Sequence, residues 1–315
     1  MPPAGRSFIP RLSRLQYLAF ATLCLIWGST WMAIRVLVHD VPPLRAAAIR
    51  FVLADFFLIV IVLAKKLRWP QTRQQWRALI VLGITFIGLP YGLLFWAERR
   101  ITSSLTAVIY SAAPLVVALF TPLMTHQRVP RHAVYGMVWA LGGIAVLFYT
   151  GLSFSPYLLF GGLAVVAAVL ISSWSTIYAK RHLKDVNPLS GITIQFAVAA
   201  AFLYPASLLR ERGSESTWTS SSVLALAFLA LFGSIVTFSL YYWLLRSMLP
   251  YQLSTLNLIV PLIAIMEGAL ILREPVPLIM LIAALVVLAA VGSILRAEDE
   301  RPQELGLRAS IKEEL

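Results

Sequence analysis

The stretch Trp27-Gly28-Ser29-Thr30-Trp31 decides the fold, because its pattern of aromatic and small residues returns as Trp174-Ser175-Thr176-Ile177-Tyr178. The tryptophans that open the two stretches are 147 residues apart (174 − 27), and Pro114 and Pro261 are separated by the same distance. Aromatic residues repeat this offset in three more pairs, namely Tyr91 with Phe238, Phe95 with Tyr242 and Trp96 with Trp243. A weak internal repeat of this length predicts a chain built from two related halves.

The composition places the chain in a membrane. Of its 315 residues, 59% are hydrophobic and 13% are charged, and the mean hydropathy is +0.82. A soluble domain carries about 25% charged residues, so the bulk of this chain is expected to lie in lipid. The net charge of +12 comes largely from basic residues in short loops between apolar runs. This favours a role in membrane topology over binding to nucleic acid.

Ten apolar stretches are long enough to cross the hydrocarbon core, which takes roughly 20 residues of helix. The sequence therefore predicts an all-α integral membrane protein with helices near residues 15–38, 44–64, 76–97, 102–124, 132–150, 157–179, 188–209, 222–245, 250–272 and 276–296. We divide it into a cytoplasmic N-terminal arm (1–14), a first five-helix repeat (15–150), a second five-helix repeat (157–296) and a cytoplasmic tail (297–315).

The distribution of lysine and arginine predicts the orientation. With both termini in the cytoplasm, 18 of these residues fall in cytoplasmic segments and seven in outer segments, as the positive-inside rule favours. Because five helices per repeat is an odd number, the second half inserts upside down relative to the first. The charges agree with this. The loop after the sixth helix is basic, with Lys180, Arg181 and Lys184, and is therefore expected in the cytoplasm, whereas the equivalent loop after the first helix is expected outside. Such an inverted repeat can open a shared central site to either side by exchanging the conformations of its halves.

Two mid-helix prolines mark a candidate site. Pro114 and Pro261 each remove a backbone hydrogen bond and free the carbonyl four residues earlier. Those carbonyls belong to Tyr110 and Asn257, which are also 147 residues apart. Non-helical backbone at this depth is tolerated where it is packed in protein or lines a wet cavity. We therefore expect two kinks beside a central cavity, with Tyr110 and Asn257 orienting polar groups of a solute. The alternative is that the prolines only bend their helices.

Deep aromatic residues are a second candidate site. Trp27 and Trp31 are four residues apart and share one face of the first helix, and Trp174 and Tyr178 repeat this arrangement in the sixth. Tyr91 lies deep in the third helix. We expect these five side chains to line the cavity. The alternatives are an aromatic belt at the membrane interface for Trp174 and Tyr178, and plain packing for Tyr91.

Three ionisable residues inside helices are candidates for gating or coupling. A charge at mid-membrane costs roughly 2.5–3.5 kcal/mol on insertion scales, yet Arg50, Asp55 and Glu267 lie within predicted helices. Arg50 and Glu267 are expected at similar depth, where an ion pair between them would help to close an outer gate. The alternative is an Arg50 that reaches outward alone and a protonated, hydrogen-bonded Glu267. Asp55 is either neutral in packing or part of a proton relay.

No enzyme signature is present. The sequence has no Walker loop, no cluster of His and Cys with metal-ligand spacing, and neither G-x-S-x-G nor H-E-x-x-H. We therefore expect no catalysis, no cofactor and no metal. The single cysteine, Cys24, lies in the first helix, so no intrachain disulfide is expected. Small residues in the fifth and tenth helices permit close packing, either within the protein or in a homodimer.

In order and spacing, several short motifs resemble the EamA family of the drug/metabolite transporter superfamily over residues 15–296. They are Ile26-Trp27-Gly28-Ser29-Thr30, Arg50-Phe51, Ala113-Pro114 and Gly142-Gly143 in the first half, and Val260-Pro261 and Arg273-Glu274-Pro275-Val276 in the second. The resemblance implies ten helices, cytoplasmic termini and a central substrate cavity, in the plasma membrane or a bacterial inner membrane. It also implies export of small metabolites, often amino acids, or of toxic compounds.

Together these features predict a secondary transporter that works by alternating access. Its expected partners are a small amphipathic or aromatic solute, membrane lipid and, if Glu267 or Asp55 couples transport, protons. The alternatives are an uncoupled facilitator, a channel-like uniporter, and a receptor or scaffold that binds without net transport.

Overall fold

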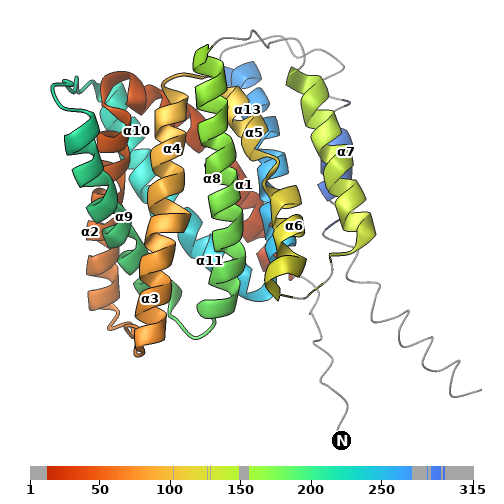
Figure 1. Ribbon diagram of the computed structural model, residues 1–315, viewed down its shortest axis with the longest axis horizontal. Coiled ribbons are helices and arrows are strands. Elements are labelled where there is room, and N and C mark those ends of the chain that lie inside the picture. The colour runs from red at the N-terminus through yellow and green to blue at the C-terminus, as the bar shows by residue number, and fades with distance from the viewer. Residues whose placement is uncertain are drawn as a thin grey trace, which may run out of the picture.

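The computed structural model describes residues 13–148 and 156–271, except 102, 126 and 128, together with residues 282, 285–291 and 294. Every element in this part of the chain is a helix, and Figure 1 shows the helices packed side by side as a bundle. In chain order they are α1 (Arg14–Asp40), α2 (Pro43–Ala64), α3 (Arg73–Leu82), η1 (Gly83–Gly88), α4 (Leu89–Glu98), α5 (Ser103–Tyr110), α6 (Ala113–Thr125), α7 (Arg131–Phe148), α8 (Pro156–His182), α9 (Pro188–Arg210), α10 (Ser220–Ala230), η3 (Leu231–Val236), α11 (Thr237–Ser247), α12 (Pro250–Ser254) and α13 (Leu256–Ile271).

Seven helical runs in the described part are long and apolar enough to cross a membrane. They are Arg14–Asp40, Pro43–Ala64, Arg73–Glu98, Thr106–Thr125, Leu159–His182, Pro188–Arg210 and Ser220–Ser247. These runs correspond to the expected helices one to four and six to eight. The expected fifth helix is present as α7, and the expected ninth is present up to Ile271. Most of the expected tenth helix (276–296), the arm before residue 13 and the tail 297–315 lie outside the described residues.

Polar caps explain where several helices begin. Ser13 accepts a hydrogen bond from the backbone N–H of Gln16, and the Gln16 side chain accepts one from the N–H of Ser13. Thr72 and Gln75 form the same reciprocal pair at the start of α3. The Asn187 side chain accepts two backbone N–H groups at the start of α9. Each cap satisfies donors that the first turn of a helix leaves free.

Two of the membrane-spanning runs, Arg73–Glu98 and Ser220–Ser247, share an irregularity that the sequence did not reveal. α3, η1 and α4 form one continuous run, and α10, η3 and α11 form another; in both, the middle six residues are π-helical. The π-helices η1 and η3 begin 148 residues apart (231 − 83), one residue from the repeat offset. Figure 1 shows the first run rising from α3 to α4 and the second descending from α10 to α11. π-Turns are rare and are frequent at functional sites.

The two candidate prolines differ in their surroundings. Pro114 follows a break at Ser111 and Ala112 that separates α5 from α6, as expected for a residue that cannot continue the helical hydrogen-bond ladder. Pro261 lies inside α13, and the break before that helix falls at Thr255, six residues earlier (261 − 255). The chain therefore leaves the helical path next to Pro114 but not next to Pro261, and the two halves are not equivalent at this point.

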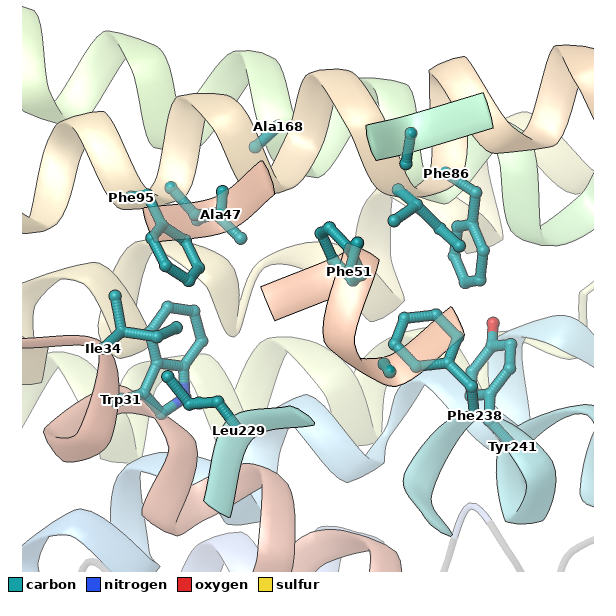
Figure 2. Close-up of a cluster of buried hydrophobic side chains, with 14 of the residues drawn as sticks. Trp31, Ile34, Ala47, Phe51, Phe86, Phe95, Ala168, Leu229, Phe238 and Tyr241 are labelled. Carbon is teal, nitrogen blue, oxygen red and sulfur yellow. The ribbon is translucent and has the colours of Figure 1, made fainter. Parts of the chain in front are cut away.

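Packing joins helices that are far apart in the sequence. α2 packs against α9, whereas α1 packs against α13, α10 and α11. Figure 1 places α2 and α9 at one end of the bundle and α7 at the other. In the interior, Phe86 of η1 and the α11 residues Phe238 and Tyr241 belong to one buried cluster, and Figure 2 shows their rings gathered together. The two runs that contain π-helices thus meet at the centre of the protein.

Candidate functional site

A central cavity of about 70 Å³ lies between helices from both halves of the chain. Its lining consists of Trp27, Thr30, Trp31 and Ile34 of α1, Phe86 of η1, Tyr91 and Leu94 of α4, Tyr110 of α5, Ala113 and Val117 of α6, Ser172, Ser173 and Thr176 of α8, Phe238 and Tyr241 of α11, Ser254 of α12, and Asn257 and Val260 of α13. These side chains are apolar, aromatic, hydroxyl-bearing or amide, and none of these lining residues is charged.

Eight of the lining residues form four pairs that obey the repeat offset. Tyr91 and Phe238, Leu94 and Tyr241, Tyr110 and Asn257, and Ala113 and Val260 are each 147 residues apart. The members of a pair lie on corresponding helices of the two halves. The expected third, fourth, eighth and ninth helices therefore present matching faces to the cavity.

The first and sixth helices present different faces. α1 contributes Trp27 and Trp31, but their counterparts Trp174 and Tyr178 do not line the cavity. Trp174 and Tyr178 stack on each other with ring centres 4.9 Å apart, and Tyr178 stacks on His182. The expectation that this pair lines the cavity is thus not met in this conformation, because α8 turns the face bearing Ser172, Ser173 and Thr176 inward.

Hydroxyl and amide groups are held in place around the cavity. The Tyr110 hydroxyl donates to Ser172 Oγ at 2.9 Å, and the Tyr241 and Thr176 hydroxyls are hydrogen-bonded at 2.9 Å. Each of these bonds joins α8 to another cavity helix. The Asn257 amide donates to the Ser254 carbonyl at 3.1 Å, which fixes its position next to the break at Thr255. The hydroxyl groups of the Tyr110–Ser172 and Tyr241–Thr176 pairs are thus held in fixed positions in the cavity wall.

The indole N–H of Trp27 is buried without a hydrogen-bond partner among the described residues. A buried donor left in this state costs about 1–3 kcal/mol. The Trp27 ring is fixed by its neighbours, with ring centres 5.8 Å from Phe238 and 5.5 Å from Tyr241. Trp31 packs similarly on Tyr110 at 5.8 Å. The Ser173 hydroxyl, also in the cavity wall, is likewise buried without a partner in the described part of the chain. The cavity thus combines an aromatic wall with two unpaired polar groups that a solute could satisfy.

Arg50 is fully buried, and its partner is not Glu267. Its Nε donates to Ser234 Oγ at 2.9 Å, and one Nη donates to the Gly233 carbonyl at 2.7 Å, both within η3. The guanidinium also lies 4.8 Å from the centre of the Tyr91 ring. The expected Arg50–Glu267 ion pair is therefore wrong for this conformation, and so is the outward-reaching Arg50, because α2 directs this side chain onto the π-helix η3.

The carboxyl groups of Glu267, Asp55 and Glu98 have different surroundings. Glu267 accepts a hydrogen bond from the Ser29 hydroxyl of α1, which agrees with the alternative of a hydrogen-bonded glutamate. Asp55 is buried, and one of its oxygens has no partner among the described residues. Glu98, at the end of α4, is fully buried, and it accepts a hydrogen bond from Ser103 Oγ at 2.8 Å. Glu98 was not singled out from the sequence, because it lies one residue beyond the expected helix 76–97.

Arg35 of α1 ties down the C-terminal end of α4. Its guanidinium donates to the backbone carbonyl of Glu98 and, at 3.3 Å, to that of Ile101. A cation suits this place because the last carbonyls of a helix lack intrahelical partners and carry partial negative charge. We name this contact the α1 clamp.

Lys180 of α8 does the same at the C-terminal end of α11. Its Nζ donates to the carbonyls of Leu245 at 2.5 Å, Arg246 at 2.9 Å and Met248 at 2.9 Å. Leu245 and Met248 lie 147 residues after the two carbonyls that Arg35 holds (245 − 98 and 248 − 101). We name this contact the α8 clamp. Since α4 and α11 end on opposite sides of the bundle (Figure 1), so do the two clamps.

Comparison with known proteins agrees with this architecture. The model of the EamA-like transporter family matches residues 14–149 and again residues 159–296. This chain belongs to the EamA-like transporter family. Among curated proteins it is similar to the uncharacterized transporter YoaV of Bacillus subtilis, with 25% identity over 86% of this chain and 93% of the relative. It is also similar to the uncharacterized inner membrane transporter YedA of Escherichia coli K12, with 28% identity over 79% and 80%.

A solved crystal structure shares the fold of this EamA protein. The two superpose with a TM-score of 0.72 at 20% sequence identity, covering 93% of this chain and 99% of the other. The family match and the apolar helices establish a multi-pass membrane protein of a transporter family. No group of three or more His, Cys, Asp or Glu residues that could hold a metal ion occurs in the described part of this EamA chain.

Two groups of cavity residues in this EamA protein were not singled out from the sequence. Tyr241 was missed because its counterpart at the repeat offset is Leu94, so no aromatic pair marked it. Ser172, Ser173 and Thr176 were noticed only as neighbours of Trp174. Their helical spacing was the available signal, since they lie on the face of α8 that Trp174 does not occupy.

Proposed function

We propose that this protein is a secondary transporter that moves a small solute by alternating access, and that it is built from two inverted five-helix halves. The observation that carries the proposal is the set of four lining pairs at the repeat offset. Corresponding faces of corresponding helices meet at one cavity, which is the arrangement that an inverted repeat needs in order to present one site to both sides.

The size of the cavity supports a closed conformation. Pockets for drug-sized ligands have about 300–1,000 Å³, whereas this cavity has about 70 Å³. Both clamps are formed at the same time. A solute of more than a few atoms therefore enters only after helices separate, and release of one clamp at a time would open one side while the other stays shut.

Differences between the halves support an exchange of conformations. α1 presents Trp27 and Trp31 to the cavity, but α8 presents a different face, and the breaks at Ser111–Ala112 and at Thr255 do not correspond. If the halves exchange conformations, Trp174 and Tyr178 turn toward the cavity in the opposite state. The expected role of these two residues thus becomes a prediction for that state.

The cavity chemistry favours amphipathic or aromatic solutes that carry no net charge, such as amino acids in zwitterionic form. Aromatic faces would contact the apolar part, and the free Trp27 N–H and the Tyr110 and Asn257 groups would bind polar atoms. Export is the direction that the family resemblance implies. Asp55, Glu98 and Glu267 are the candidates for proton coupling. An uncoupled facilitator needs none of the three, and it remains the alternative.

Counterflow in proteoliposomes tests the proposal. Proteoliposomes that contain the purified protein are loaded with one unlabelled solute from a panel of amino acids and related metabolites. Uptake of the same solute in labelled form is then followed with and without an imposed pH gradient. Ala113→Leu, which fills the cavity, is expected to reduce counterflow at least tenfold. Ala201→Leu on the exposed face of α9 is the matched control and should leave it unchanged. If no solute moves under any gradient, the transporter function is wrong.

A further inference from the structure

A second cavity, larger than the central one, lies where α8 ends. It has a volume of about 290 Å³ and lies between the end of α8, the loop that follows it, the start of α9 and the end of α11. None of its wall belongs to the central cavity. It is therefore a separate cavity from the one on which the proposed function rests.

The wall of this cavity is strongly basic. It includes Lys180, Lys184 and Arg246, and none of its described lining residues is acidic. Asp185 lies in the same loop but is not part of the wall. Within the described part of the chain, Lys184 makes no hydrogen bond or ion pair, and Arg246 donates a single bond, to the Val186 carbonyl at 2.6 Å. Two of the three cations thus have donors left for an anion.

The start of α9 adds to the positive potential. Asn187 caps this helix and Pro188 occupies its first turn, and both line the cavity. The dipole of this helix places roughly half a positive charge here. Its first N–H groups already donate to the Asn187 side chain, so an anion would take its hydrogen bonds from the lysine and arginine side chains. Lys180 already neutralises the carbonyls at the end of α11, so the negative end of that helix does not cancel this potential.

The position of the cavity along the membrane normal is marked by Trp243. This side chain is 37% exposed on α11, and tryptophans exposed at helix ends concentrate at the level of lipid headgroups. Arg246 follows three residues later, on the same face of the helix. The basic wall therefore lies at headgroup depth, and Leu183, Val186 and Leu245 supply an apolar part next to the cations.

We propose that this cavity binds the phosphate of an anionic lipid headgroup. Basic pockets between membrane helices on the cytoplasmic side are suited to such headgroups, and Lys180, Lys184 and Arg246 are expected on that side. Lys180 belongs both to this wall and to the α8 clamp. A bound phosphate would thus lie beside the clamp and stabilise the closed state on that side.

Native mass spectrometry of the purified full-length protein tests the proposal. The protein is titrated with phosphatidylglycerol, with zwitterionic phosphatidylcholine and, separately, with inorganic phosphate. We expect one phosphatidylglycerol to be retained at least tenfold more tightly than phosphatidylcholine. Lys184→Gln combined with Arg246→Gln should remove this preference, while Arg73→Gln combined with Arg77→Gln, which removes two exposed charges of α3, should not.

Three results would overturn the lipid site. One is equal retention of the two lipids, and another is an unchanged preference in the Lys184 and Arg246 double variant. The third is protection by inorganic phosphate against thermal unfolding that phosphatidylglycerol does not increase, which would assign the cavity to a soluble anion. Lys184→Gln alone provides a variant that breaks no bond in the described structure. It should weaken phosphatidylglycerol retention several-fold with an unchanged unfolding temperature.

Discussion

Arg35 and Lys180 hold equivalent backbone carbonyls in the two halves of the protein, at opposite ends of the bundle. The cations themselves are not equivalent, because the residue 147 positions after Arg35 is His182. What the two halves share is therefore the position of the bonded carbonyls, at the C-terminal end of the run that contains a π-helix.

Removal of either clamp is expected to open the cavity to one side only. In a Cys24→Ala background, Ser173→Cys places a thiol in the cavity wall for labelling with a membrane-impermeant reagent. Lys180→Met should raise the labelling rate at least tenfold in vesicles of one orientation, because a charged hydrogen bond contributes about 1.5–3 kcal/mol. Arg35→Met should do so in vesicles of the opposite orientation.

Lys65→Met is the control, since Lys65 is exposed at the end of α2, away from both clamps. The clamps have no gating role if both variants increase labelling from the same side, or if neither changes it.

Arg50→Lys is expected to destabilise the protein by about 2–3 kcal/mol, because lysine keeps the buried charge but loses the planar fork that serves Ser234 and Gly233. Arg50→Met should cost less, since it removes the charge together with its bonds. The free energy of unfolding, measured by denaturation in mixed micelles, checks this order. A lysine variant as stable as the parent would contradict it.

Glu267→Gln should act independently of Arg50→Lys. Because the two side chains have different partners, the losses in free energy of unfolding should add to within about 0.5 kcal/mol. A coupling energy well above that value would mean that Arg50 and Glu267 interact directly, as an ion pair does.

Glu211→Gln is expected to cost about 1 kcal/mol of stability, because Glu211 caps α2 from a distant loop. Its two carboxylate oxygens accept the backbone N–H groups of Leu44 at 2.7 Å and Arg45 at 3.0 Å. Glu215→Gln in the same loop is a matched control, since Glu215 is exposed and makes no such bond. Thermal unfolding in detergent distinguishes the two, and equal effects would argue against the cap.

Gly28→Ala is expected to destabilise the protein by about 1–3 kcal/mol through overpacking. A Cβ atom at this position would meet the Ile263 side chain at 2.5 Å, where α1 packs on α13. Gly142→Ala is the control, because nothing lies within 4 Å of its Cβ, and removal of a helical glycine should stabilise α7 by up to about 1 kcal/mol. Thermal unfolding measures the stability of both variants. The prediction is wrong if Gly142→Ala destabilises the protein as much as Gly28→Ala does.

Hydrophobicity predicted the helical, membrane-spanning fold. Trp27, Trp31, Tyr91, Tyr110 and Asn257 line the central cavity, because deep aromatic and polar residues in membrane helices pack toward other helices, and their role in binding a solute stays a prediction. Helix spacing alone could not show which face of α8 turns inward, since that rotation is set by neighbouring helices. For this reason Trp174 and Tyr178 were placed incorrectly for this conformation.

The sequence also did not predict which groups the buried charges bind. Estimated depth suggested Glu267 as the partner of Arg50, but the π-helix η3 offers a carbonyl and a hydroxyl at the required position. No local pattern predicted π-helical geometry at η1 or η3. Pro261 was expected to mark a kink because proline lacks an N–H, and the structure places the helix break nearest to it at Thr255.

The contact between Arg50 and η3 also has a consequence for biogenesis. The carbonyl that Arg50 binds is supplied 183 residues later in the chain, so α2 leaves the ribosome long before its partner has been translated. Until then it carries an uncompensated charge, whose insertion costs roughly 2.5–3.5 kcal/mol. α2 therefore makes this contact only after α10 and η3 have been synthesised.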